Sequence, residues 1–238
     1  IVLLSFGGIY GPLIAEMYAK KQTLEMNHLF KLVTRWITTF SLPFAILILL
    51  FPKKIMLIFG SEFLPGYPIL MLLVTAAFIQ AVFGIGGTTL NMTGFPKINL
   101  MNTFIACGFN IGLNFYLIPT MGGKGAAIAT LITLSFIAFI RIIQNWKLLQ
   151  LTPWSPKLIK PILAGIMAFG AGYYIKVLIM PFHTIITLMS GGFIIVIVFF
   201  TTLWLLGLDE DDSGLLGGVQ IILGNFKSTP SDKNENIS

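Results

Sequence analysis

Charged side chains are scarce in this sequence, and their scarcity excludes a soluble globular protein. Of the 238 residues, 10% are charged and 56% are hydrophobic, whereas soluble domains have about 25% charged residues. The apolar residues must therefore face lipid. The formal net charge of +6 would indicate nucleic acid in a soluble protein. Here the basic residues fall between apolar segments, which favours membrane lipids as partners and no nucleic acid.

Residue types that serve catalysis and cross-linking are few. Cys107 is the single cysteine, which excludes a disulfide within the chain. His28 and His183 are far apart and have no carboxylate cluster beside them, so we expect no metal site and no cofactor. The catalytic motifs of soluble enzymes are missing as well. We therefore expect a protein that is not an enzyme.

The chain begins with an apolar run that is not a targeting sequence. Ile1 opens the run, and neither a basic segment nor a small-residue cleavage site accompanies it, which excludes a signal peptide. We expect this chain to be a fragment of a longer protein that begins inside a transmembrane helix.

Seven apolar segments are long enough to cross a membrane as helices. The sequence thus predicts an all-α polytopic transmembrane helix bundle over residues 1–206, followed by a polar, partly disordered tail at 207–238. Gly84, Gly86 and Gly87 predict a loosened helix within the third span. The expected spans are 1–18, 36–52, 67–90, 98–119, 125–144, 158–180 and 184–206.

The longest connection, residues 19–35, has the periodicity of a helix. Met26, Leu29, Phe30 and Val33 repeat at helical spacing, with charged residues on the other faces. This pattern predicts an interfacial amphipathic helix that leads into the second span.

Basic residues are divided unequally between the two sides of the predicted bundle. Nine Lys and Arg residues fall in the connections after the first, third and fifth spans, and four fall in the connections on the opposite side. The positive-inside rule places the richer side in the cytoplasm. We therefore expect a multi-pass protein of the cell membrane whose chain starts outside and whose C-terminal tail is cytoplasmic.

The fourth span carries the strongest polar pattern of the sequence. Asn102, Asn110 and Asn114, together with Asn99, lie within about 120° of one another on a helix. Amides facing lipid would be costly, so this face must point into the protein or into a wet cavity. Two interpretations stay open, namely hydrogen bonds between helices and a hydrophilic lining that contacts a polar solute.

Four other residues are singled out by their positions in the spans. Gly108 and Gly112 form a G-x-x-x-G pair on the face opposite the asparagines, which permits close helix packing. Gln80 in the third span is a second, weaker candidate for a polar lining. Arg35 is a candidate for contact with an anion, although its place near a helix end also suits snorkelling to the headgroups.

Several segments resemble the multidrug/oligosaccharidyl-lipid/polysaccharide exporter superfamily. Residues 5–52 resemble its eighth and ninth helices, and residues 57–63, LIFGSEF, look like one of its turns. The stretch 110–130, which ends in LIPTMGGKGAAIAT, closely resembles the polysaccharide transporter branch, the O-antigen flippase type. The likeness covers residues 1–150, and the last two spans fit as added C-terminal helices.

The resemblance implies a fold of two six-helix lobes, of which this chain would be most of the C-terminal lobe. It implies a transporter that flips a polyprenyl-pyrophosphate-linked oligosaccharide, a polysaccharide precursor, across the membrane by alternating access. The implied partners are this lipid-linked glycan and the N-terminal lobe of the same protein. Asn102, Asn110, Asn114 and Gln80 would then line the sugar cavity, and Arg35 would meet the diphosphate.

Two other functions remain open at this point. A multidrug or organic-cation antiporter of the same superfamily should carry acidic residues in its cavity, and the predicted spans offer none. A membrane-embedded enzyme would need a catalytic cluster on an outer loop, where the sequence offers little beyond Lys53, Lys54, Glu62 and Lys124.

Overall fold

The structure is a computed structural model that describes residues 2–179 and 184–207. Within those ranges the regular structure is helical and contains no strand, as predicted. The predicted tail lies outside the described residues apart from Gly207. The elements are α1 (Val2–Ala19), α2 (Thr23–Leu50), α3 (Pro52–Phe59), η1 (Ser61–Gly66), α4 (Tyr67–Phe83), α5 (Ile85–Met92), α6 (Pro96–Met121), α7 (Gly123–Leu149), η2 (Pro156–Leu158), α8 (Ile159–Ile179) and α9 (Thr184–Leu205).

Six helical segments of the described chain are long and apolar enough to cross a membrane. They correspond to the second to seventh expected spans, and the first expected span corresponds to α1, which the six do not include. The chain is therefore an all-α polytopic helix bundle.

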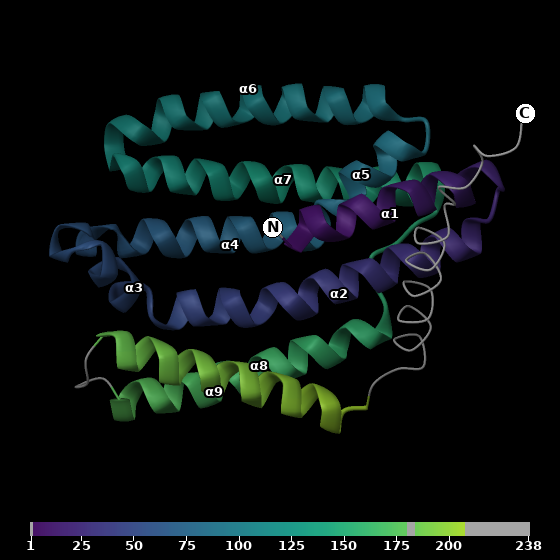
Figure 1. The fold of residues 1–238 in the computed structure, drawn as a ribbon. Coiled ribbons are helices and arrows are strands. Elements are labelled where there is room, and N and C mark those ends of the chain that lie inside the picture. The colour runs from purple at the N-terminus through teal and green to yellow at the C-terminus, as the bar shows by residue number, and fades with distance from the viewer. Residues whose placement is uncertain (1, 180–183, 208–238) are drawn as a thin grey trace, which may run out of the picture.

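The helices lie side by side with alternating direction (Figure 1). α6 and α7 form a hairpin at one edge, α7 packs on α4, and α4 packs on α2. α2 then packs on α8, and the hairpin of α8 and α9 forms the opposite edge. α1 contacts α2 and α5. α2 is thus the central helix between two hairpins.

The predicted interfacial helix at 19–35 is corrected by the structure. Residues 23–50 form one continuous helix, α2, so the amphipathic segment and the second span are not separate elements. The apolar face was located correctly, but it packs against protein and not against lipid headgroups. The buried cluster that contains this face consists of Tyr10, Ile14, Met26, Leu29, Phe30, Val33, Ile37, Ile85, Leu149 and Leu151.

The third span is interrupted at Gly84, where the glycines predicted a loosened helix. α4 ends at Phe83 and α5 begins at Ile85. The short helix α5 is held from both sides, because the Tyr10 hydroxyl lies 2.7 Å from Thr89 Oγ1 and Asn145 Nδ2 donates to the Gly86 carbonyl at 3.1 Å. The break at Gly84 therefore separates α4 from a short helix, α5, that is mostly buried.

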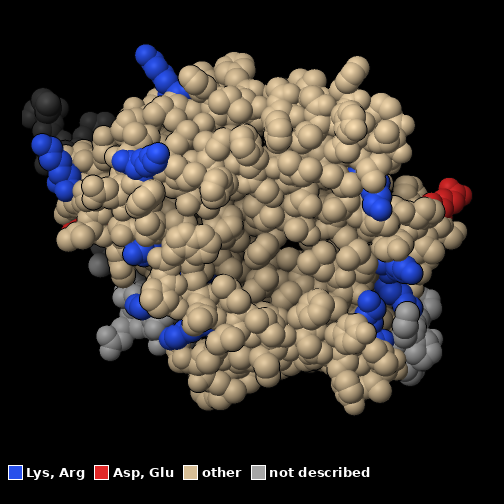
Figure 2. Space-filling model, turned by 180° about the vertical axis from the view of Figure 1, so that it is seen from behind, with Lys and Arg blue, Asp and Glu red and all other residues tan. Residues whose placement is uncertain are grey.

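On the face shown in Figure 2, Lys and Arg lie toward the two ends of the helices, with a band free of charge between them. The starts of α2, α6 and α8 lie at one end of the bundle, and the starts of α4, α7 and α9 lie at the other (Figure 1). The connections therefore divide between two sides as the sequence predicted.

Candidate functional site

The asparagine face of α6 points at α7. Asn102 is buried, and its Nδ2 donates to Gln144 Oε1 at 2.6 Å while Gln144 Nε2 donates to Asn102 Oδ1 at 2.9 Å. This reciprocal amide pair satisfies four polar groups between two helices. Interhelical hydrogen bonding, one of the two interpretations of the sequence pattern, thus accounts for Asn102.

Asn110 and Asn114 continue the same seam and are half-buried. Asn110 Nδ2 donates to Thr133 Oγ1 on α7 at 3.2 Å, and Asn114 Nδ2 donates to Asn110 Oδ1 at 2.8 Å. Neither residue, nor Asn102, lines the cavities described below.

A second polar group joins α5, α6 and α7 nearer to the start of α6. Arg141 Nε donates to Asn99 Oδ1 at 3.1 Å, and Asn99 Nδ2 donates to Asn91 Oδ1 at 3.0 Å. A Cβ at Gly87 would lie 3.1 Å from the Arg141 guanidinium carbon, so the glycine makes room for this side chain. This group is not evident from the sequence, because Asn99 and Arg141 are 42 positions apart.

The remaining predicted residues of the spans have different surroundings. Gln80 is half-buried, and its Oε1 is buried without a hydrogen-bond partner in the described part of the chain. A Cβ at Gly108 or Gly112 would meet no atom within 4 Å. The close packing predicted for these two glycines therefore does not occur among the described helices.

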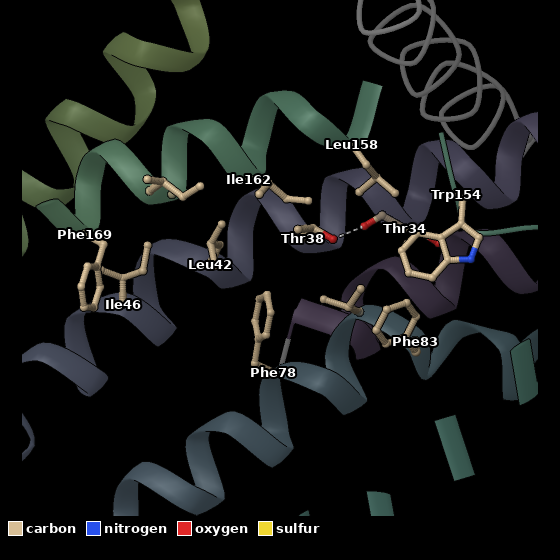
Figure 3. Close-up of a pocket in the computed structure, with 13 residues that line it drawn as sticks. Thr34, Thr38, Leu42, Ile46, Phe78, Phe83, Trp154, Leu158, Ile162 and Phe169 are labelled. Carbon is tan, nitrogen blue, oxygen red and sulfur yellow. Dashed lines mark hydrogen bonds between the residues drawn. The ribbon is translucent and has the colours of Figure 1, made fainter. Parts of the chain in front are cut away.

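An apolar groove opens between α2, α4 and α8, with a volume of about 440 Å³ (Figure 3). α2 contributes Thr34, Thr38 and Leu42 to its wall. Thr34 and Thr38 donate their hydroxyls to the carbonyls of Phe30 and Thr34, both at 2.8 Å. These internal bonds hide the hydroxyl groups, so the wall is hydrocarbon in character.

The aromatic end of this groove is built by α4 and by the segment before α8. The rings of Phe83 and Trp154 lie 6.0 Å apart between centroids, and both line the groove (Figure 3). Gly165 of α8 lets the helices approach, because a Cβ there would lie 3.2 Å from Leu42 Cγ. The groove thus lies beside the contact at which α8 packs against α2.

A basic pocket lies on the other side of the α2–α8 contact. It consists of two cavities of about 310 and 200 Å³ that share Arg35 and Lys157. Arg35 is 7% exposed although it is charged. The basic side chains that line the pocket are His28, Lys31, Arg35, Lys157 and Lys160.

The groove and the basic pocket adjoin at η2. Lys157 lines the basic pocket, and the next residue, Leu158, lines the groove. Of the five basic residues, sequence reasoning singled out Arg35 as a candidate anion contact. Lys157 and Lys160 follow Arg35 by more than 120 positions, so their common pocket appears only when α8 packs on α2.

Of the described acidic residues, Glu25 lies one helical turn before His28 of the pocket, and both residues line a further cavity. Glu16 accepts a hydrogen bond from Lys20 Nζ at 2.7 Å. Glu25 lies in the first turn of α2, about 15 Å along the helix axis from Arg35, and Glu62 lies in η1 at the opposite end. Basic side chains line the pocket and hydrocarbon lines the groove beside it, which is a combination that suits an anion next to a hydrocarbon chain.

Comparison with known proteins supports a membrane protein. No family model matches the chain. Over 180 residues the chain is 32% identical to an uncharacterized membrane protein of Methanocaldococcus jannaschii. The matched region covers 74% of this chain and 35% of that protein. The chain thus spans about a third of its relative's length. Together with the six apolar helices, this similarity supports a multi-pass membrane protein.

Proposed function

We propose that this chain is part of a transporter that flips a polyprenyl-diphosphate-linked oligosaccharide across the cell membrane by alternating access. In this proposal it is a carrier and not an enzyme. The end that holds the basic pocket and α9's last turn faces the cytoplasm, in line with the richer supply of Lys and Arg there.

The observation that carries the proposal is the apolar groove next to the basic pocket. A polyprenyl diphosphate has a hydrocarbon chain joined to two phosphates, so it needs these two environments side by side. Hydrocarbon burial in the groove contributes about 25 cal/mol per Å² of buried apolar surface. Arg35 and Lys157 supply charge-assisted hydrogen bonds for phosphate oxygens.

The glycan role predicted for Asn110 and Asn114 stays part of this proposal. Their amides bond at the α6–α7 seam, yet both residues are half-buried, so a polar solute at the seam remains within their reach. An antiporter of organic cations is less well supported, since the described acidic residues, Glu16, Glu25 and Glu62, all lie near helix ends.

The test is a flipping assay with the full-length protein in sealed proteoliposomes. The probe is a short-chain polyprenyl diphosphate that carries one fluorescent N-acetylhexosamine, and a membrane-impermeant quencher reports the leaflet. Arg35→Gln removes a charged donor worth about 1.5–3 kcal/mol. We expect it to lower the flipping rate by roughly tenfold or more.

The matched control is Lys176→Gln, which removes a cation from the last turn of α8 at the opposite end. We expect its rate to equal that of the unaltered protein. If the unaltered protein does not flip the probe, or if Arg35→Gln flips it at full rate, the proposed function is wrong.

A further inference from the structure

Arg141 of α7 lies apart from the groove and from the basic pocket, because it lines neither cavity. It is half-buried. Its guanidinium makes one hydrogen bond among the described residues, from Nε to the neutral Asn99 Oδ1 at 3.1 Å, and it forms no ion pair with any of their carboxylates. An Arg side chain has five N–H donors. The other four donors of Arg141 therefore remain for a further acceptor.

The packing around Arg141 holds its side chain in one position. A Cβ at Gly87 would lie 3.1 Å from the guanidinium carbon, so the glycine lets the charged group lie against the α5 backbone. Asn99, which accepts from Nε, is oriented in turn because its Nδ2 donates to Asn91 Oδ1 at 3.0 Å. Asn145 Nδ2 donates to the Arg141 carbonyl at 2.8 Å and to a carbonyl of α5 at 3.1 Å. The guanidinium is therefore preorganised, which lowers the entropy cost of binding a ligand.

The surroundings of Arg141 are those of the membrane surface. α7 has 27 residues and is about 40 Å long, which exceeds the roughly 30 Å hydrocarbon core of a bilayer. Arg141 lies about 12 Å along the axis from the end of α7, at the end of the bundle where α6 begins (Figure 1), so its long side chain can reach the headgroups. Around Asn99 and its partner on α5, exposed side chains include the cation Lys97 and the apolar Met92 and Leu100.

A phosphate suits this site for two reasons. The planar guanidinium fork matches two oxygens of one phosphate, and an anion there would compensate a charge that is costly to leave unpaired beside lipid. The ligand must also lie next to exposed apolar side chains, which the acyl chains of a phospholipid can cover and a soluble anion cannot. We propose that Arg141, oriented by Asn99, binds the phosphate of an anionic phospholipid. This lipid stays bound and is not carried, so the inference goes beyond the proposed function.

Native mass spectrometry of the full-length protein, released from detergent micelles, tests the site. The probe is phosphatidylglycerol, added in competition with phosphatidylcholine, which has the same phosphodiester but no net charge. The readout is the ratio of the two lipids that stay bound to the protein. We expect the unaltered protein to retain phosphatidylglycerol in preference. Arg141→Gln should weaken phosphatidylglycerol binding by roughly tenfold or more, because charge-assisted hydrogen bonds are lost.

Two further variants separate this site from general surface charge. Asn99→Asp, which is nearly isosteric, places a carboxylate beside Arg141 Nε, so an internal anion competes with the phosphate and the preference for phosphatidylglycerol should be lost. It decides the question if Arg141→Gln does not fold, as judged by size-exclusion chromatography. Lys147→Gln is the matched control, since it removes an exposed cation from the last turn of the same helix. We expect Lys147→Gln to bind the lipids as the unaltered protein does.

Three results would overturn the inference. They are an unchanged lipid preference in Asn99→Asp, an equal loss of the preference in Lys147→Gln, and displacement of phosphatidylglycerol by an excess of inorganic phosphate. The last result would assign the cluster to a soluble phosphate. Lipid retention needs no transport, so a flipping assay that fails while the lipid preference holds would contradict the proposed function and leave the lipid site intact.

Discussion

Asn102 and Gln144 stabilise the α6–α7 hairpin through two hydrogen bonds at 2.6 and 2.9 Å. Hydrogen bonds between membrane helices contribute about 0.6 kcal/mol on average and at most about 1.7 kcal/mol. A double-mutant cycle with Asn102→Leu and Gln144→Leu should give a coupling energy in this range. Each single change leaves one buried amide without its partner, and the double change removes both amides.

The measurement is equilibrium unfolding in mixed detergent micelles. We expect the double variant to lose less stability than the sum of the losses in the two single variants. Strict additivity of the two changes would contradict the pairing. A parallel cycle with Thr103→Val, whose hydroxyl bonds within α6 to Asn99 O, provides a control without coupling to Gln144.

At this scale the sequence predicted the polar face of α6 but not the partners of its residues. The spacing of Asn102, Asn110 and Asn114 places them on one side of a helix, and helical geometry alone determines that result. The partners Gln144 and Thr133 lie on another helix, so they follow from packing. The basic pocket shows the same division, since Arg35 was singled out and Lys157 was not.

At the scale of elements, the α6–α7 hairpin depends on one close backbone approach. A Cβ at Gly125 would overlap the carbonyl group of Leu117, and neither backbone segment can yield without moving its helix. Gly125→Ala should destabilise the protein by about 1–3 kcal/mol, as overpacking does. The measurement is the unfolding midpoint in mixed micelles.

Gly112→Ala is the matched control on the other helix of the same hairpin. Its added Cβ would meet no atom within 4 Å, so we expect stability to stay the same or to rise slightly through helix propensity. Equal losses for the two alanine variants would mean that the close approach at Gly125 does not hold the hairpin together.

Elements themselves were largely predictable, because a lipid solvent requires long apolar helices. The prediction of an interfacial helix at 19–35 was wrong because an apolar face can be covered by protein as well as by lipid. The face with Met26 and Phe30 has the pattern of a helix lying on a membrane, yet it is buried against α1 in a cluster that also holds Ile85, Leu149 and Leu151. An amphipathic pattern predicts that the apolar face is covered, and tertiary packing determines whether protein or lipid covers it.

At the scale of the whole molecule, the position of the charges gives a testable orientation. Ser61 and Ser155 lie at opposite ends of the bundle, in η1 and just before η2. In a Cys107→Ser background, a membrane-impermeant maleimide applied to intact cells should label Ser61→Cys. Ser155→Cys should react only after the cells are made permeable, because the positive-inside rule places its end in the cytoplasm. The opposite labelling pattern would reverse the orientation.

The position of Pro43 in α2 has a consequence for motion. Proline lacks the N–H that would bond to the carbonyl four residues earlier, so a helix bends there most easily. The α2 residues up to Ile37 belong to one buried cluster, with α1 and α5, and those from Ile46 onward belong to a second, with α8 and α9. Pro43 lies between the buried members of the two clusters on α2, next to Leu42, which packs against the second cluster. A bend at Pro43 would therefore fall between the buried residues of the two clusters and would leave the packing within each cluster in place.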